Sequence, residues 1–311
     1  MFEPYYPNKW GITPEMDLGQ LPMFIAVIKG LKPAMTGVIN QDSYTKLKEF
    51  CKKFNLSLII SDYKLINPPE ELLKELKQKQ KLPTTRNICV PLSNPNNGNI
   101  YFYISREEKD AINAKKFHWE NQIINGRIVS TSFVDHINFG YAMGYPDCCI
   151  KKFINTLLMR LNPTERAFIE TKGKFSFYTN NLPMDHYYFL THHHPCSFRC
   201  KKTIKKSKEL LKAIKEDDEI LAKKIEYHLK LPFLVMEEKL SIAFQGKIKN
   251  EEIYYKNCYL IGNPTDKLFF NKFKWRNRIR ITDEEIKIYK NDFLLEIINK
   301  KNKFNGFILK F

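Results

Sequence analysis

The chain carries the stretch YPDCCI at residues 145–150, and a second stretch, HHHPCSFRC, follows at residues 192–200. Together the two stretches contain four of the seven cysteines. Each also contains a proline, which suits the first position of a helix because the missing N–H would have no partner there. Apolar residues at helical spacing follow both prolines, so each stretch is predicted to begin an amphipathic helix. We therefore expect residues 130–245 to be mainly helical.

Four sulfur atoms would then lie at two helix starts. Cys148 and Cys149 fall in the first turn of one helix, where unpaired N–H groups and the positive end of the helix dipole lower the pKa of a thiol. Cys196 and Cys200 are four residues apart and would share one face of the other helix. If the two helix starts meet, the four thiolates converge on one point, as a metal ion or an iron–sulfur cluster requires.

The adjacent pair Cys148 and Cys149 bears on which metal is bound. Zinc usually takes its cysteines from pairs with about two to four residues between them. Neighbours on a helix point about 100° apart, which suits two iron corners of one cluster. The sequence therefore favours a 4Fe–4S cluster, with zinc as the alternative, bound by Cys148, Cys149, Cys196 and Cys200. A disulfide or four plain buried thiols also stay open, because free cysteine often behaves as a small core residue.

The two stretches also resemble the motifs of a family of uncharacterised prokaryotic proteins that is common in archaea. Its members carry Gly-Tyr-Pro-x-Cys-Cys, matched here at residues 144–149, and His-x-Pro-Cys-Ser-x-x-Cys, matched at residues 193–200. The resemblance covers roughly residues 136–245 and brings no assigned reaction with it. It implies a shared site made of Cys148, Cys149, His193, Cys196 and Cys200.

His193 is the candidate catalytic residue. It stands three residues before Cys196, close enough to bind the metal or to hydrogen-bond a substrate at an open iron corner. A cluster with three cysteine ligands would make the protein an enzyme, of sulfur chemistry or of RNA modification, whose substrate the sequence does not identify. With four ligands, electron transfer or a structural role is expected. A histidine that only packs in a loop is the alternative.

The protein is strongly basic. Of its 311 residues, 51 are Lys or Arg and 34 are Asp or Glu, so its formal net charge is +17. Such a charge favours anionic partners, nucleic acid above all, although a lysine-rich surface also suits a heat-adapted protein. The zinc alternative is accordingly a zinc-stabilised RNA-binding module.

Two groups of residues would contact RNA in that module. Cations on the helix after Cys200 would bind phosphates, and an aromatic–basic stretch near the C terminus would stack on unpaired bases. An ordinary solvated helix face and an ordinary strand are the alternatives. The candidate contacts are Lys201, Lys202, Lys205, Lys206, Trp275 and Arg276.

The sequence predicts a cytoplasmic protein with no membrane segment. The first residues include Glu3 and Pro4 and lack the basic-then-apolar pattern of a secretory signal. The apolar segment at residues 21–35 is interrupted by Lys29 and Lys32, so it is too short and too charged to cross a bilayer. In a reducing compartment, clustered cysteines bind metal or catalyse more often than they form disulfides.

Strands and helices alternate in the first 125 residues, which predicts an α/β layer. Strands are expected at residues 36–39, 56–66, 88–92 and 100–104. Helices are expected at residues 42–54, with Asp42 as the cap, and at residues 70–80 and 107–117. No glycine-rich phosphate loop follows any of these strands, so a nucleotide-binding fold of the usual type is not expected.

The fold class is therefore mixed α+β. Beyond residue 249 the chain is predicted to form an antiparallel β segment, with strands at residues 253–260, 268–275, 278–281 and 286–289. Three regions follow: an α/β N-terminal region (1–125), a helical metal- or cluster-binding core (126–248) and a β-rich C-terminal region (249–311).

Overall fold

The computed structural model describes residues 20–66, 88–118, 121–124, 127–130, 135–159, 161–185, 188–237, 240–262, 267–300 and 306–311. Packing divides the chain into two compact units, built mainly from Ala26–Tyr145 and from Pro146–Phe311. Both mix helices with antiparallel strands, so the predicted α+β class is confirmed, while the three-region division stays a prediction. No helix within these ranges is long and apolar enough to cross a membrane.

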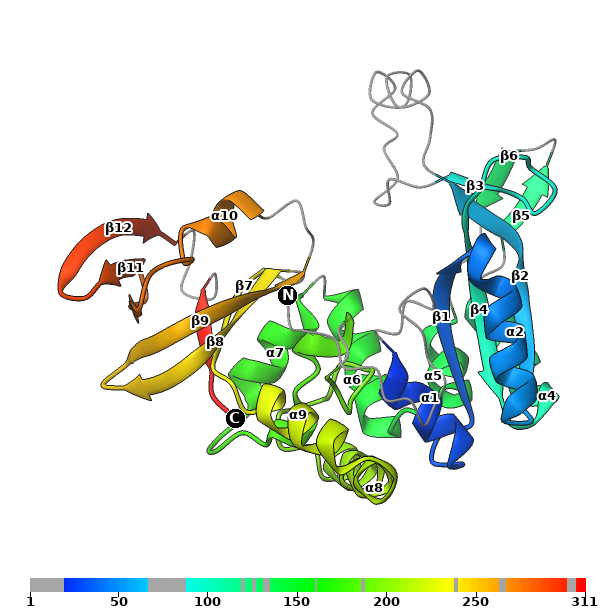
Figure 1. The fold of residues 1–311 in the computed structure, drawn as a ribbon, viewed down its shortest axis with the longest axis horizontal. Helices are drawn as coiled ribbons and strands as arrows, with labels where there is room; N and C mark the ends of the chain where they lie inside the picture. Colours follow the sequence, from blue (N-terminus) through cyan, green and yellow to red (C-terminus); the bar gives the residue numbers. More distant parts are fainter. Residues whose placement is uncertain are drawn as a thin grey trace. The chain divides into compact units, whose positions relative to one another are not determined.

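Four antiparallel strands form the main sheet of the first unit, in the order β1-β4-β2-β3 (Figure 1). Two helices contact this sheet, α2 (Tyr44–Lys53) and α4 (Glu108–His118). Ala111 and Ala114 of α4 are buried in one cluster with Tyr103, because small side chains let a helix lie close to a sheet. Each strand overlaps a predicted one: β1 (Ala34–Asn40), β2 (Ser57–Ile66), β3 (Ile88–Pro91) and β4 (Asn99–Ser105).

The start of α2 differs from the prediction at Asp42. A 3-10 turn, η3 (Gln41–Ser43), precedes the helix, and the Asn40 side chain caps this turn by accepting the N–H of Asp42 at 2.9 Å. Asp42 is therefore inside the turn and does not cap α2. The predicted helix at residues 70–80 lies outside the described residues. The remaining elements before Pro146 are α1 (Leu21–Ile28), β5 (Asn121–Ile124), β6 (Arg127–Ser130) and α5 (His136–Ala142).

Between Pro146 and Pro232 the described residues contain four α-helices: α6 (Asp147–Leu158), α7 (Pro163–Glu170), α8 (Lys201–Asp217) and α9 (Glu219–Leu229). The break between α8 and α9 lies at Asp218, whose carboxylate accepts the N–H of Leu221 at 2.8 Å and caps α9. The predicted mainly helical region ends before residue 245. The chain enters strand β7 at Phe233, directly after Pro232, because the buried run Phe233-Leu234-Val235 packs inside a sheet.

The segment between α7 and α8 is irregular, so the prediction of a helix starting at Pro195 is wrong. The described residues between Thr171 and Cys200 contain only two 3-10 turns, η4 (Phe177–Thr179) and η5 (Leu182–Asp185). Side chains pair with the backbone there instead: Thr179 donates to the carbonyl of Phe198 at 3.0 Å, and Thr191 donates to the carbonyl of Tyr178 at 2.9 Å. Such bonds replace those that a helix would make within its own backbone.

The C-terminal part forms a seven-stranded antiparallel sheet in the order β12-β11-β10-β9-β8-β7-β13. The predicted strands at residues 253–260, 278–281 and 286–289 are confirmed, and the last two pair with each other. The strands are β7 (Phe233–Glu237), β8 (Leu240–Lys249), β9 (Glu252–Gly262), β10 (Arg278–Ile281), β11 (Glu285–Lys290), β12 (Phe293–Asn299) and β13 (Phe307–Leu309).

The predicted strand at residues 268–275 is wrong. This stretch begins as a short helix, α10 (Lys267–Asn271), and continues as turns. Phe270 and Phe273 are buried in the core of the sheet together with Phe244. Their spacing of three residues brings both rings to one side of a helical turn, whereas a strand would point them to opposite faces.

Candidate metal centre

The structure brings the four cysteines together. The sulfur atoms of Cys148, Cys149, Cys196 and Cys200 all lie within 4.8 Å of one another. The Sγ of Cys200 is 3.7 Å from that of Cys148 and 3.6 Å from that of Cys149. Cys149 and Cys200 are buried, and the other two are half-buried. Four converging sulfurs are compatible with a bound metal ion or cluster.

The first pair is placed by the start of α6. Pro146 has an extended backbone, with φ −62° and ψ 132°, and occupies the N-cap. Its carbonyl accepts the N–H groups of Cys149 and Ile150 at 2.8 and 3.0 Å, so both cysteines lie in the first helical turn. Asp147 is the first residue of the helix and pairs with Lys151 at 3.2 Å.

The second pair reaches the same point through the irregular segment. Cys200 is the N-cap of α8, and its carbonyl accepts the N–H of Ile204 at 2.9 Å. Cys196 stands in the preceding loop, so these two cysteines do not share a helix face. Two helix starts nevertheless meet at the sulfurs, as predicted, and both direct their positive ends toward negative charge.

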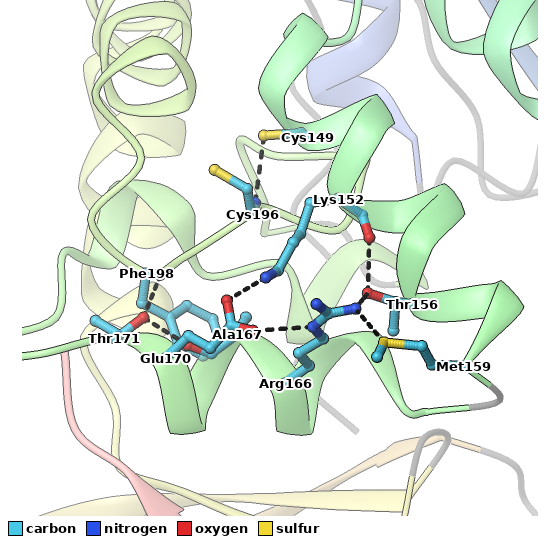
Figure 2. Close-up of polar contacts among 10 residues, drawn as sticks. All are labelled: Cys149, Lys152, Thr156, Met159, Arg166, Ala167, Glu170, Thr171, Cys196 and Phe198. Carbon is cyan, nitrogen blue, oxygen red and sulfur yellow. Dashed lines mark hydrogen bonds and ion pairs between the residues drawn. The ribbon is translucent and has the colours of Figure 1, made fainter.

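Hydrogen bonds link the sulfurs to one another and to the backbone. Figure 2 shows the backbone N–H of Cys196 donating to the Cys149 sulfur, at 3.3 Å. Bonds from the thiols of Cys149 and Cys196 hold the pKa of Cys200 far below its usual range. Hydrogen bonds with Cys196 and Cys200 raise the pKa of Cys149. A bound metal ion would displace the protons that remain on the thiols.

His193 approaches the cysteines through Thr203. Its Nε2 lies 3.0 Å from the Thr203 hydroxyl, and that hydroxyl lies 3.4 Å from the Cys149 sulfur. A catalytic role for His193 stays a prediction. The neighbouring histidines have other contacts: His194 stacks on Phe153 with ring centroids 5.5 Å apart, and the ring of His192 lies 5.7 Å from that of Phe189.

A group of charged side chains ties α6 to α7 beside the cysteines (Figure 2). Glu170 pairs with Lys152 of α6 and, at 2.9 Å, with Arg166 of its own helix. Both cations lower the pKa of the Glu170 carboxyl, Lys152 more strongly. Arg166 also donates to Thr156 of α6 at 3.2 Å. These contacts hold the two helices together and so support the start of α6, which carries two of the sulfurs.

A small pocket opens next to this group. The pocket is open to solvent, and its walls include Lys152, Arg166, His194 and Cys196. Solvent can therefore approach the centre at Cys196.

Sequence reasoning missed Lys152, Arg166 and Thr203. The spacing of Thr203 three residues after Cys200, on the same side of the helix, was the available signal for the last of these.

The candidate RNA contacts fall into two separate places. Lys201, Lys202, Lys205 and Lys206 are all exposed on the first half of α8. Trp275 is 81% exposed and has a positive φ of 62°, whereas Arg276 is half-buried. Figure 1 shows α8 and α10, the helix that precedes Trp275, well apart. The lysines and the tryptophan therefore do not form one continuous surface.

Residues 119–230 match the model of a family described as a protein of unknown function, DUF483. The matched range contains the four cysteines and His193. An uncharacterised family is thus found where the two motifs predicted one, over a range that overlaps the predicted residues 136–245. No curated protein and no solved structure matches the chain.

Proposed function

We propose that the four cysteines hold one tetrahedral zinc ion and that the protein is a zinc-stabilised RNA-binding protein. The distances between the sulfur atoms support the zinc ion. Zinc–sulfur bonds are about 2.3 Å long, so sulfurs at the corners of a tetrahedron lie about 3.8 Å apart. The two contacts of Cys200, at 3.6 and 3.7 Å, fit this value.

A 4Fe–4S cluster, favoured by the adjacent cysteines, is the competing candidate. Each thiolate of such a cluster binds a different iron, so the body of the cluster separates its sulfurs more widely than one ion does. The closeness of all four sulfurs therefore supports a single ion. Four thiolates around one ion also leave no open position for a substrate, which is typical of structural rather than catalytic zinc.

The position of α8 supports the proposal that the protein binds RNA. The helix begins at Cys200, a metal ligand in this proposal, so the ion would fix the end of the helix that carries the lysines. Five lysines and no acid occur in residues 201–208. A fixed row of exposed cations binds phosphates with less loss of conformational entropy than a flexible one. The overall charge of +17 adds attraction for a polyanion.

Metal and sulfide analysis, with an absorption spectrum, tests the metal on protein purified without oxygen. One zinc per chain, no sulfide and no colour would support the proposal. About four irons and four sulfides, with broad visible absorption, would overturn it in favour of the cluster. Protein that carries neither metal and takes up no added zinc would contradict both.

Trp275 offers a separate test of RNA binding. If its exposed ring stacks on a base, Trp275→Ala should lower the affinity for single-stranded RNA about 5- to 150-fold, since a stacked base contributes about 1–3 kcal/mol. Fluorescence anisotropy with a labelled RNA of mixed sequence measures the change. Leu268→Ala is the matched control, because Leu268 is 84% exposed in the same segment but has no ring. Equal losses in the two variants would argue against stacking.

A further inference from the structure

The Cys149 sulfur has a second hydrogen-bond partner deep in the protein. Besides the backbone N–H of Cys196, the hydroxyl of Thr203 approaches it at 3.4 Å. Thr203 is fully buried on α8. Its other neighbour is the Nε2 atom of His193, at 3.0 Å.

Metal binding would fix the direction of these hydrogen bonds. A metal-bound cysteine is a thiolate, which can only accept hydrogen bonds. The single proton of the Thr203 hydroxyl must then point toward the Cys149 sulfur. The short contact with His193 consequently requires a proton on Nε2, so that the imidazole donates to the threonine oxygen.

We propose that His193 and Thr203 form a donor chain that orients the Cys149 thiolate and strengthens its hold on the bound ion. This inference rests on the proposed zinc site. His193 is a positioning residue in this chain, because it acts on the metal ligand through Thr203 and contacts no reacting atom. A hydrogen bond lowers the energy of the sulfur lone pairs and reduces the reactivity of the thiolate. Cys196, which borders the solvent-open pocket, would be the more reactive sulfur.

Cobalt substitution gives a direct readout of the donor chain. Cobalt(II) occupies tetrahedral thiolate sites and shows a sulfur-to-metal charge-transfer band whose energy falls when a thiolate loses a hydrogen bond. Thr203→Val should shift this band to longer wavelength and lower metal affinity about 10- to 100-fold, as expected for partners of metal ligands. Thr203→Ser, which keeps the hydroxyl, should restore both.

Two matched variants of His193 test the hydrogen bond between His193 and Thr203. His193→Gln keeps an N–H group near the position of Nε2, and His193→Leu removes it. The charge-transfer band should therefore shift to longer wavelength in His193→Leu and should shift less in His193→Gln. Ser207→Ala is the control: Ser207 is buried one turn further along α8 and bonds Thr191 at 3.0 Å rather than a sulfur.

The outcomes separate this inference from the zinc proposal. If wild-type protein binds no cobalt or zinc, the zinc site itself is wrong. If it binds one ion per chain but Thr203→Val leaves both the band and the affinity unchanged, the donor chain is wrong and the zinc site stands. An equal loss of affinity in Thr203→Val and Ser207→Ala, with no change in the band, would show general loosening of the core and would also overturn the donor chain.

Discussion

Cys149→Ser should remove the bound ion and lower the melting temperature of the unit that contains it by about 8–16 °C. A metal that joins Cys149 to Cys196 closes a loop of 47 residues, and by the chain-entropy estimate for cross-links such a loop stabilises the fold by about 4 kcal/mol. About 1 kcal/mol corresponds to about 2–4 °C in a domain of this size. Zinc content and differential scanning calorimetry measure the two effects.

Cys258→Ser is the control for that variant. Cys258 is a half-buried cysteine in β9 and lies outside the group of four. It should retain one zinc per chain and unfold close to the wild-type temperature. Full zinc content in Cys149→Ser, or an equal loss of zinc from Cys258→Ser, would contradict the assignment of the ligands.

Replacing Lys201, Lys202, Lys205 and Lys206 together by glutamine should weaken RNA binding roughly 100- to 1,000-fold at low salt. Each exposed ion pair contributes up to about 1 kcal/mol, and glutamine keeps much of the length and helix propensity of lysine. The dependence of the logarithm of affinity on the logarithm of salt concentration should become less steep by up to about 3, at about 0.7 for each phosphate contact with a single strand. Titrations at several salt concentrations give both quantities.

A second set of four exposed lysines provides the matched control, because their replacement by glutamine changes the net charge by the same amount. They lie on strands of the C-terminal sheet, at Lys247, Lys249, Lys256 and Lys290. If this variant loses as much affinity as the first, binding reflects net charge alone and α8 has no special part in it. Both variants should keep their zinc.

The local pattern of side chains predicted several helices and strands correctly. It failed where hydrogen-bond partners far away in the sequence determine the local structure. Residues 99–105 are rich in aromatic and β-branched side chains, and they form β4. From the sequence alone, the four-residue spacing of Cys196 and Cys200 also fits a helix. The chain is irregular there because Thr171 accepts the N–H of Phe198 at 2.9 Å and Asn180 donates to the carbonyl of Leu229 at 3.0 Å. Such partners, 27 and 49 residues away, cannot be found from local spacing.

Short apolar runs were the other source of error. Residues 268–275 mix aromatic and basic side chains in an order that fits a strand, but the same order fits one helical turn. The structure resolves the ambiguity because Phe270 and Phe273 fill the core beside Phe244. The convergence of the cysteines was easier to predict, since four thiols in two motifs have a common chemical purpose that does not depend on the intervening fold.

The charge pattern of α8 has a cost for the helix itself. A helix favours acids at its start and bases at its end, whereas here five of the seven lysines occupy residues 201–208, and Glu216 and Asp217 lie in the last turn beside Lys215. This is local frustration: the sequence of the helix opposes the dipole of its own backbone. Residues 201–217 cut out as a peptide would be a poor helix, and burial of Leu210 and Ile214 must compensate in the protein. The helix is therefore less stable than one with the opposite order of charges, and its first half carries a concentrated positive surface.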